Sequence, residues 1–374
     1  MPDRQRMVEE FVELARIASL SKKEKAMAEA VAAKLRELGL EPEFDSAGEA
    51  IGGEVGNLIA HLPATQEGLP RLMFNAHLDT VAPGEGIEPV VEGDRISSAG
   101  DTIVAADDKC GVVAALETVR CLMEENLAHG GVDVVFTIAE EIGLYGAKHL
   151  DYSRVGAELA YVLDGGEQPG CITRAAPYAN SINFTVRGRA AHAGVCPEQG
   201  INALQAAAKG IACMNLGRLD ERSTANVGVI EGGKAPNIVP DLCVVQGEAR
   251  SHDEARLEAQ TEHMVECMER AAEEFGAKVE PQIQRSYNGF FLDDNDPVVA
   301  LAAKAAQALG LEPQLEIGGG GSDANIFNEH GLPAVIISTG AASVHTTQEY
   351  VHIPTMVQAA DWLLQIVRLL AEEV

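Results

Sequence analysis

The amino-acid sequence predicts an α/β fold in which a mixed sheet is flanked by helices and a smaller α+β domain is inserted into the chain. Three observations lead to this class. The first third alternates helical periodicity with apolar, strand-like runs. The middle alternates apolar and polar residues, as half-exposed antiparallel strands do, and the end returns to helices and an apolar strand. We therefore expect a discontinuous domain, residues 1–175 and 289–374, interrupted by a domain of residues 176–288.

In the first third, helices are expected over residues 5–18 and 24–38, where apolar side chains recur at helical spacing. Gly39 stands where a glycine commonly ends a helix. Another helix is expected over about 109–125. The expected strands run from Leu72 to Phe74, from Val132 to Ile138 and from Leu159 to Leu163. Because these strands are almost continuously apolar, both faces of their sheet should be covered.

In the middle, residues 181–189 and 243–250 predict antiparallel strands, because SINFTVRGR and CVVQGEAR mix apolar and polar positions. Gly276 ends the long acidic helix expected there. The other elements expected after the first third are helices over 200–214, 253–275, 297–309 and 355–373 and a strand over 334–339. The change of pattern on both sides of the middle segment indicates the inserted domain.

Composition and charge exclude several classes of partner. The 374 residues carry a formal charge of −29, so nucleic acid and anionic membranes, which attract basic surfaces, are poor partners. No apolar run approaches the length of a membrane span, and the first residues lack the apolar centre of a signal peptide. Seven scattered cysteines do not form a disulfide framework and are expected in the core. These features favour a cytoplasmic protein.

Side chains that bind metal ions follow several of the predicted strands. They are His77 and Asp79, Asp107 and Asp108, Glu140 and Glu141, Asp164, and His345 or the nearby His352. Each alone has an ordinary explanation, such as acids at a helix N-terminus or in a turn. Adjacent glutamates, however, repel each other unless a cation is near. Because all these residues would meet at one edge of an α/β sheet, where such folds place their sites, the sequence predicts a metal centre.

The motifs HLDT, AADDKCG, EEIGLYGA and LDGG together resemble the di-zinc metallopeptidase and aminoacylase superfamily, most closely its peptidase T branch. The resemblance covers nearly the whole chain. It implies a two-domain zinc exopeptidase-like fold whose inserted domain acts as a lid and dimerisation domain. A second group of di-metal aminopeptidases carries similar motifs but inserts its domain between the first histidine and the bridging aspartate. Only 28 positions (107 − 79) separate Asp79 from Asp107, which is too few.

The resemblance also implies a role for each residue of the centre. The expected ligands are His77 and Asp164 for one zinc ion, Glu141 and His345 for the second, and Asp107 as the bridge. Glu140 would be the general base and Asp79 would support His77, although adjacency alone cannot order the two glutamates. A cis peptide is implied between Asp107 and Asp108. Imidazole and carboxylate ligands suit zinc, with manganese or cobalt as substitutes.

Outside the metal centre, the resemblance assigns His192 to stabilisation of the oxyanion, often from the partner subunit, and Asn237 and Arg250 to substrate contact. In the segment GGGGSD, Ser322 is expected to bind substrate at the start of a helix. Without the resemblance, the first three would be a loop histidine, a turn asparagine and a surface arginine. For the glycine segment the alternative is a flexible linker, but close approach of its backbone to substrate, with an anionic group at the helix N-terminus, is the interpretation we favour. The glycines are not a phosphate-binding loop, because no Gly-Lys-Ser/Thr follows them.

The function implied is hydrolysis of short peptides by an aminopeptidase of the tripeptidase kind. We expect two zinc ions per subunit and a cytoplasmic homodimer formed through the inserted domain. Two alternatives on the same scaffold stay open, an N-acyl amino acid deacylase and a carboxypeptidase. A catalytically inactive binding protein is disfavoured, because such a relative would be expected to lose ligands or the base, and this sequence retains both.

Overall fold

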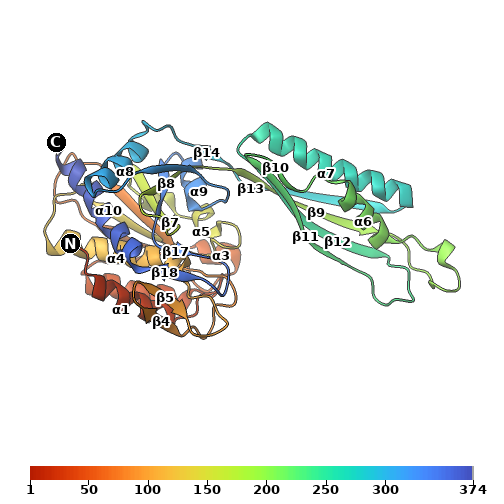
Figure 1. The fold of residues 1–374 in the computed structure, drawn as a ribbon, viewed down its shortest axis with the longest axis horizontal. Helices are drawn as coiled ribbons and strands as arrows, with labels where there is room; N and C mark the ends of the chain where they lie inside the picture. Colours follow the sequence, from red (N-terminus) through yellow and green to blue (C-terminus); the bar gives the residue numbers. More distant parts are fainter. Residues whose placement is uncertain (373–374) are drawn as a thin grey trace. The chain divides into compact units, whose positions relative to one another are not determined.

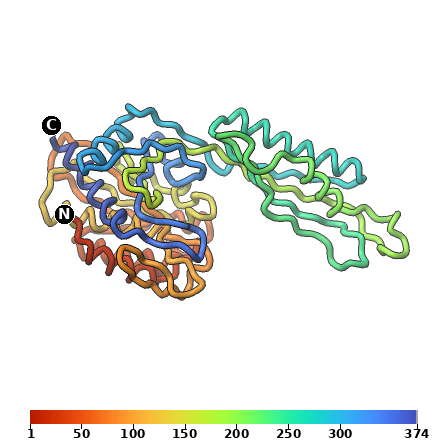
Figure 2. Tube along the Cα trace, in the orientation of Figure 1, coloured from red at the N-terminus to blue at the C-terminus, as the bar shows by residue number. Residues whose placement is uncertain are grey.

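A computed structural model describes residues 1–372 and divides into two compact units. The first unit contains Met1–Ala175, Phe291–Gly318 and the chain from Ser322 onwards. The inserted unit contains Ala176–Phe290 together with Gly319–Gly321. The red N-terminal and blue C-terminal segments of Figure 2 thus belong to one unit, and the green middle segment forms the other. Residues 373–374 of the expected first domain, and residue 373 of its closing helix, lie outside the described residues.

Among the described residues, nine strands form the large mixed sheet of the first unit. In order across the sheet they are β1 (Glu43–Phe44), β2 (Leu58–Leu62), β6 (Val132–Thr137), β3 (Leu72–His77), β7 (Leu159–Gly165), β16 (Ala334–Ser338), β8 (Cys171–Ala176) and β14 (Phe290–Phe291), with β15 (Gln314–Ile317) beside β8. The four central strands, β6, β3, β7 and β16, run parallel. All residues of β3 and β6 are buried, as expected for strands covered on both faces.

Helices flank this sheet, as the sequence predicts. They are α1 (Arg4–Ala15), α2 (Lys25–Glu37), α3 (Ala47–Ile51), α4 (Ala106–Glu124), α5 (Tyr145–Lys148), α8 (Pro297–Ala308), α9 (Asp323–Glu329) and α10 (Ile353–Glu372), with a 3₁₀ turn at Tyr152–Arg154. A small second sheet contains β17 (Ala341–Ala342), β18 (Tyr350–His352), β5 (Arg95–Ser98) and β4 (Pro89–Glu92). The sequence did not predict these short strands, because two to four residues carry too little periodicity.

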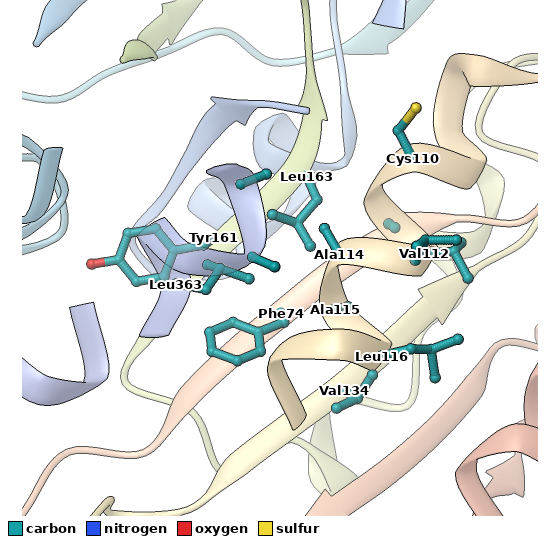
Figure 3. Close-up of a cluster of buried hydrophobic side chains, with 14 of the residues drawn as sticks. Phe74, Cys110, Val112, Ala114, Ala115, Leu116, Val134, Tyr161, Leu163 and Leu363 are labelled. Atoms are coloured by element: carbon teal, nitrogen blue, oxygen red, sulfur yellow. The ribbon is translucent and has the colours of Figure 1, made fainter. Parts of the chain in front are cut away.

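The core of the first unit lies between α4 and the central strands. Figure 3 shows Val112 and Leu116 of α4 among the apolar side chains of the neighbouring strands. A Cβ atom on Gly111 would stand 2.3 Å from the carbonyl oxygen of Leu163, so only glycine lets α4 approach β7 this closely. The indole of Trp362 donates a hydrogen bond of 2.8 Å to the carbonyl oxygen of Ala302 and ties α10 to α8. This packing fixes the start of α4 beside the sheet edge.

The inserted unit has an antiparallel sheet with two helices on one face (Figure 1). Its strands, in order, are β10 (Gly217–Asp220), β11 (Ser223–Gly232), β12 (Leu242–Ser251), β9 (Tyr178–Arg187) and β13 (Lys278–Tyr287), and its helices are α6 (Ala203–Cys213) and α7 (Glu254–Phe275), with a 3₁₀ turn at Pro197–Gln199. Alternate residues of β9, Ile182, Phe184 and Val186, are buried under the helices, which confirms the expected half-exposed strand.

Some expectations for the inserted unit were incomplete. The sequence did not predict β11 and β13, because their outward residues are exposed and Pro281 interrupts the pattern of β13. The expectation that the cysteines lie in the core is wrong for Cys213, which is exposed at the end of α6. None of the helices within residues 1–372 combines the length and the apolar character that a membrane span requires.

Candidate metal centre

The carboxyl ends of neighbouring parallel strands bring the predicted ligands to one edge of the large sheet. β3 ends at His77, the turn after β6 carries Glu140 and Glu141, and Asp164 is the second-last residue of β7. β3 lies between β6 and β7 in the sheet and is parallel to both. This is the edge at which open α/β sheets place their sites.

Four of the predicted ligands are in direct contact. The Nε2 atom of His77 lies 2.9 Å from Oδ1 of Asp107, in the first turn of α4. The Nε2 atom of His345, in the loop between β17 and β18, lies 3.3 Å from Oδ2 of Asp107 and 3.0 Å from Oε2 of Glu141. Asp107 therefore presents one carboxylate oxygen to each histidine, an arrangement that suits a carboxylate shared by two ions.

Asp164 joins the cluster beside His77 and Asp108. One ligand atom from each of these three residues lies within 4.8 Å of the others, as do atoms of His77, Asp107 and Glu141. The carboxylate of Asp108 also accepts a hydrogen bond of 3.1 Å from the backbone N–H of His77, which joins α4 to β3. It accepts a second, of 3.2 Å, from the N–H of Gly111 within α4. The peptide between Asp107 and Asp108 is cis, as the resemblance implies.

The backbone next to the cluster adopts left-handed conformations at several residues other than glycine, among them Ala105, Ala139 and His345. Their φ angles are 62° at Ala105, 51° at Ala139 and 61° at His345. Side chains with a Cβ rarely adopt this conformation, and it persists where surrounding contacts hold it. At Ala139, the backbone N–H donates to the buried carboxylate of Glu24 at 3.0 Å. Buried carboxylates thus fix the segments that carry the ligands.

Asp79 is the clearest case of such a buried carboxylate. Its Oδ1 atom accepts from the N–H of Glu140 at 2.9 Å, and its Oδ2 atom accepts from the N–H of Glu141 at 3.2 Å and from the hydroxyl of Ser21 at 2.6 Å. The support implied for His77 comes mainly from the Asp79 carbonyl oxygen, 2.9 Å from Nδ1, while the nearest carboxylate oxygen is at 3.5 Å. Asp79 therefore positions both glutamates and the histidine.

We expect Asp79→Asn to lower kcat/KM by roughly 10- to 100-fold, as loss of a residue that orients metal ligands commonly does. An asparagine presents one carbonyl oxygen, so its NH₂ group would face one of the two backbone N–H groups. The measurements are the steady-state catalytic rate and the metal content. Ser21→Ala is the matched control, because it removes only the hydroxyl donor and should have a small effect. Equal losses in both variants would contradict the assignment of Asp79.

Glu349 holds the segment before Asp107 in a similar way. The Oε2 atom of this buried carboxylate accepts from the N–H of Val104 at 2.8 Å and of Ala105 at 2.7 Å, and Oε1 accepts from the N–H of Asp107 at 3.2 Å. Glu349 is four residues after His345, so it connects the loop of one expected ligand to the backbone of another. Sequence reasoning missed it, because a glutamate in the segment TQEY carries no distinctive signal.

We expect Glu349→Gln to lower the free energy of unfolding by about 1–3 kcal/mol, the usual cost of leaving a buried donor without an acceptor. The amide NH₂ would face either the N–H of Asp107 or the pair at Val104 and Ala105. Denaturant unfolding of the metal-free and metal-loaded forms measures the change. Gln348→Ala, at the exposed neighbouring position, should leave stability almost unchanged. An unchanged Glu349→Gln variant would show that the three N–H groups do not depend on this carboxylate.

The cluster concentrates negative charge in a buried place. Burial, together with the neighbouring carboxylates, raises the pKa of Asp164 and Glu140 well above their ordinary values and that of Glu141 to about 7. For Asp107, burial acts in the same direction, but the imidazoles of His345 and His77 outweigh it and lower the pKa. Hydrogen bonding to Asp107 raises the pKa of His345 to about 9. Such a cluster is stabilised by added positive charge, which divalent cations supply.

Asp323, the first residue of α9, is a site residue that sequence reasoning missed. It is 1% exposed, and its Oδ2 atom accepts from the hydroxyl of Thr137 at 2.5 Å. Burial raises the pKa of Asp323 to about 6. Ser322 caps α9, with its hydroxyl accepting from the N–H of Ala324 at 3.2 Å. The sequence signal for Asp323 was its place just after a segment of four glycines. Such a glycine segment can equally be a linker, so the sequence did not single out Asp323.

The other predicted residues lie in the inserted unit. His192 and Asn237 are exposed and belong to adjacent loops, joined by a hydrogen bond of 3.0 Å from the N–H of Ala193 to the carbonyl oxygen of Asn237. Arg250 on β12 pairs with Glu248, with N–O distances of 3.1 Å and 3.0 Å.

The sequence left open whether His345 or His352 belongs to the cluster. His352 bonds Thr355 through Nδ1 at 2.8 Å, whereas His345 reaches the cluster, so His345 is the histidine that the structure brings to the centre. Cys110 of α4 is fully buried in the core, as the sequence predicts for the cysteines.

Two solved structures that share this fold along the whole chain are an aminopeptidase and a tripeptidase. The aminopeptidase PepT of Bacillus cereus ATCC 10987 is 40% identical, with a TM-score of 0.88 and 99% of each chain covered. A tripeptidase of Staphylococcus aureus subsp. aureus Mu50 is 37% identical, with a TM-score of 0.93 and 100% of each chain covered. The protein YqjE of Bacillus subtilis (strain 168), named as uncharacterized, is 40% identical and covers 98% of this chain and 99% of its own.

The two full-length similarities to an aminopeptidase and a tripeptidase indicate a two-domain peptidase. Residues 73–369 match the family described as peptidase family M20/M25/M40, and the chain belongs to that family. Membership confirms the resemblance inferred from the HLDT, AADDKCG, EEIGLYGA and LDGG motifs, the two-domain fold and the hydrolysis of peptide bonds.

Proposed function

We propose that the protein is a di-zinc aminopeptidase that removes the N-terminal residue from short peptides, tripeptides among them. The observation that carries the proposal is the cluster of His77, Asp107, Glu141, Asp164 and His345 at the sheet edge. The full-length similarity to an aminopeptidase PepT and to a tripeptidase supports the choice of substrate.

The donor set of the cluster fits zinc. Two imidazoles and three carboxylates offer the nitrogen and oxygen ligands that zinc, manganese and cobalt accept, whereas magnesium and calcium favour oxygen alone. His77 and Asp164 would hold one ion, Glu141 and His345 the other, and Asp107 would contact both. When bound, two such ions polarise a peptide carbonyl and make water more acidic.

Glu140 is the proposed general base. Its backbone N–H is fixed by Asp79, and its side chain is buried, which raises the pKa of the carboxyl group. A carboxylate with a raised pKa accepts a proton from water readily, and the same oxygen then delivers the proton to the leaving amine. Burial of this side chain also excludes bulk water that would compete for the proton.

The proposed contacts with substrate come from four further residues. His192 would donate a hydrogen bond to the oxyanion, and Asn237 and Arg250 would bind the peptide, with the guanidinium suited to its C-terminal carboxylate. Because Arg250 is paired with Glu248, the carboxylate of a substrate would have to compete with that partner. Ser322 is the fourth proposed contact, although its hydroxyl already caps α9.

The proposal extends to the assembly and the location of the protein. We propose a homodimer formed through the inserted unit and a cytoplasmic enzyme. Sedimentation velocity of the intact chain measures the oligomeric state, and a monomer at micromolar concentration would overturn the dimer. Fractionation of the cells that produce the protein tests its location.

A panel of matched substrates tests the proposed specificity. The zinc-loaded enzyme is given free tripeptides, the same tripeptides with an acetylated N-terminus, and N-acetyl amino acids, and the products are identified by mass spectrometry. We expect release of the N-terminal residue from free tripeptides and no cleavage of the acetylated ones. Release of the C-terminal residue would establish the carboxypeptidase alternative, and faster cleavage of N-acetyl amino acids would establish the deacylase.

A further inference from the structure

Two cysteine sulfurs meet in the inserted unit, whereas the metal ligands described above belong to the first unit. Cys213 is the last residue of α6 and Cys267 lies on α7, and their Sγ atoms are 2.6 Å apart. The helices approach closely because Gly210 faces Met268, whose Sδ atom would stand 2.7 Å from a Cβ atom at position 210. The backbone itself therefore brings the two thiols together.

The two thiols differ in accessibility and surroundings. Cys213 is exposed, whereas Cys267 is 1% exposed. The guanidinium of Arg270 donates to Sγ of Cys213 at 3.1 Å and lies 3.7 Å from Sγ of Cys267. The Nε2 atom of His263 lies 3.8 Å from Sγ of Cys267. A cation beside an accessible sulfur stabilises the thiolate, which is the form that reacts with oxidants.

We propose that Cys213 and Cys267 form a reversible disulfide in response to hydrogen peroxide, with Cys213 as the residue that is oxidised first. The Cys213 sulfur attacks one peroxide oxygen and the O–O bond breaks. This leaves a sulfenic acid on Cys213, and the departing hydroxide takes the thiol proton as water. The Cys267 sulfur then attacks the sulfur of the sulfenic acid. The S–S bond forms, the S–O bond breaks, and hydroxide leaves with the Cys267 proton as a second water. Two thiols lose two electrons, and one peroxide is reduced to two waters.

The surroundings assign the order of these steps. Peroxide reaches the exposed Cys213 sulfur, to which the Arg270 guanidinium donates a hydrogen bond. Cys267 is buried, and burial raises the pKa of its thiol, so it is not the residue that reacts first with peroxide. Its contact with the Cys213 sulfur makes it the partner for the second step. The disulfide would join α6 to α7 and close a loop across the inserted unit, which is independent of the proposed peptidase chemistry.

The test uses the full-length, metal-loaded protein, reduced and then treated with one equivalent of hydrogen peroxide. We expect the loss of two free thiols per chain, counted under denaturing conditions. Peptide mapping should find the segments that carry Cys213 and Cys267 joined within one chain, about 2 Da lighter than the separate peptides. Treatment with dithiothreitol should restore both thiols. A disulfide between two chains, or oxidation at other cysteines instead, would overturn the proposal.

Variants test the order of steps. Cys267→Ser should stop at the sulfenic acid of Cys213, which a cyclic diketone such as dimedone traps, whereas Cys213→Ser should react slowly and yield no disulfide. Arg270→Met should slow the loss of thiols severalfold without changing the product. Cys196→Ser, a half-buried cysteine of the same unit, is the matched control and should still lose two thiols. Trapping at Cys267 in preference to Cys213 would overturn the assigned order. Because thiols are counted, failure here is distinguishable from failure of the proposed peptidase function.

Discussion

Replacing Glu140 by glutamine should lower kcat by about 10²- to 10⁴-fold while leaving about two metal ions per chain, because this range is typical for the loss of a general acid–base group. Glutamine has nearly the same volume as glutamate, so the buried position should tolerate it. It cannot accept the proton of the attacking water or return one to the leaving amine. Steady-state hydrolysis of a tripeptide and elemental analysis of the purified variant measure the two quantities.

The neighbouring glutamate provides the sharpest control. Glu141 contacts His345 through its carboxylate, so Glu141→Gln should lower metal content as well as activity. Glu85→Gln, at an exposed position, should change neither. A Glu140→Gln variant that keeps most of its turnover would contradict the assignment of the base. Metal loss in Glu140→Gln with full metal content in Glu141→Gln would show that the two roles are reversed.

Replacing Asp107 by asparagine should remove both ions and lower kcat/KM by more than about 100-fold, since loss of a residue that merely orients ligands already costs roughly 10- to 100-fold. Asp107 is the residue whose two oxygens face the two histidines, at 2.9 Å and 3.3 Å. Asparagine supplies only one oxygen and no charge, so the second contact and the charge balance are both lost. Elemental analysis and isothermal titration with zinc measure the effect.

One matched variant and one measurement of secondary structure distinguish loss of the metal ions from a simple folding defect. Asp101→Asn changes an exposed aspartate on the loop before α4 and should keep both ions and full activity. Circular dichroism should show that Asp107→Asn retains its secondary structure. A folded Asp107→Asn variant that still binds two zinc ions with unchanged affinity would remove Asp107 from the centre.

The sequence was most informative where buried strands end in polar side chains. The apolar runs at Leu72 and Val132 predict central strands, and their order along the chain places His77 and Glu141 at the same edge. Those strands are fully buried, so their hydrophobic pattern is strong. His345 is different, because it arrives through a loop between two short strands that carry almost no pattern.

The residues that hold the ligands in place could not be predicted from the sequence. Glu349 and Glu24 accept hydrogen bonds from backbone N–H groups, a partner that every residue offers, so no local pattern indicates the contact. Asp323 follows glycines that are equally compatible with a linker. Glu349 and Glu24 support the left-handed backbone at Ala105 and Ala139, and Asp323 lies beside the ligands. Only folding brings these residues to the centre.

The contact between Cys213 and Cys267 also could not be predicted from the sequence. The two cysteines are 54 positions apart (267 − 213), and cysteines in helices ordinarily occupy apolar core positions. Their contact depends on the close approach of α6 and α7 at Gly210. A glycine inside a helix signals such an approach only when the partner helix is known.

The central claim, that His77, Asp107, Glu141, Asp164 and His345 hold two divalent ions, is tested most directly by anomalous X-ray diffraction at the zinc absorption edge. Crystals of the protein purified with zinc should show two strong peaks, one between His77 and Asp164 and one between Glu141 and His345, both adjacent to Asp107. Crystals with no peak in this cluster, or with its carboxylates paired to lysine or arginine side chains instead, would contradict the account.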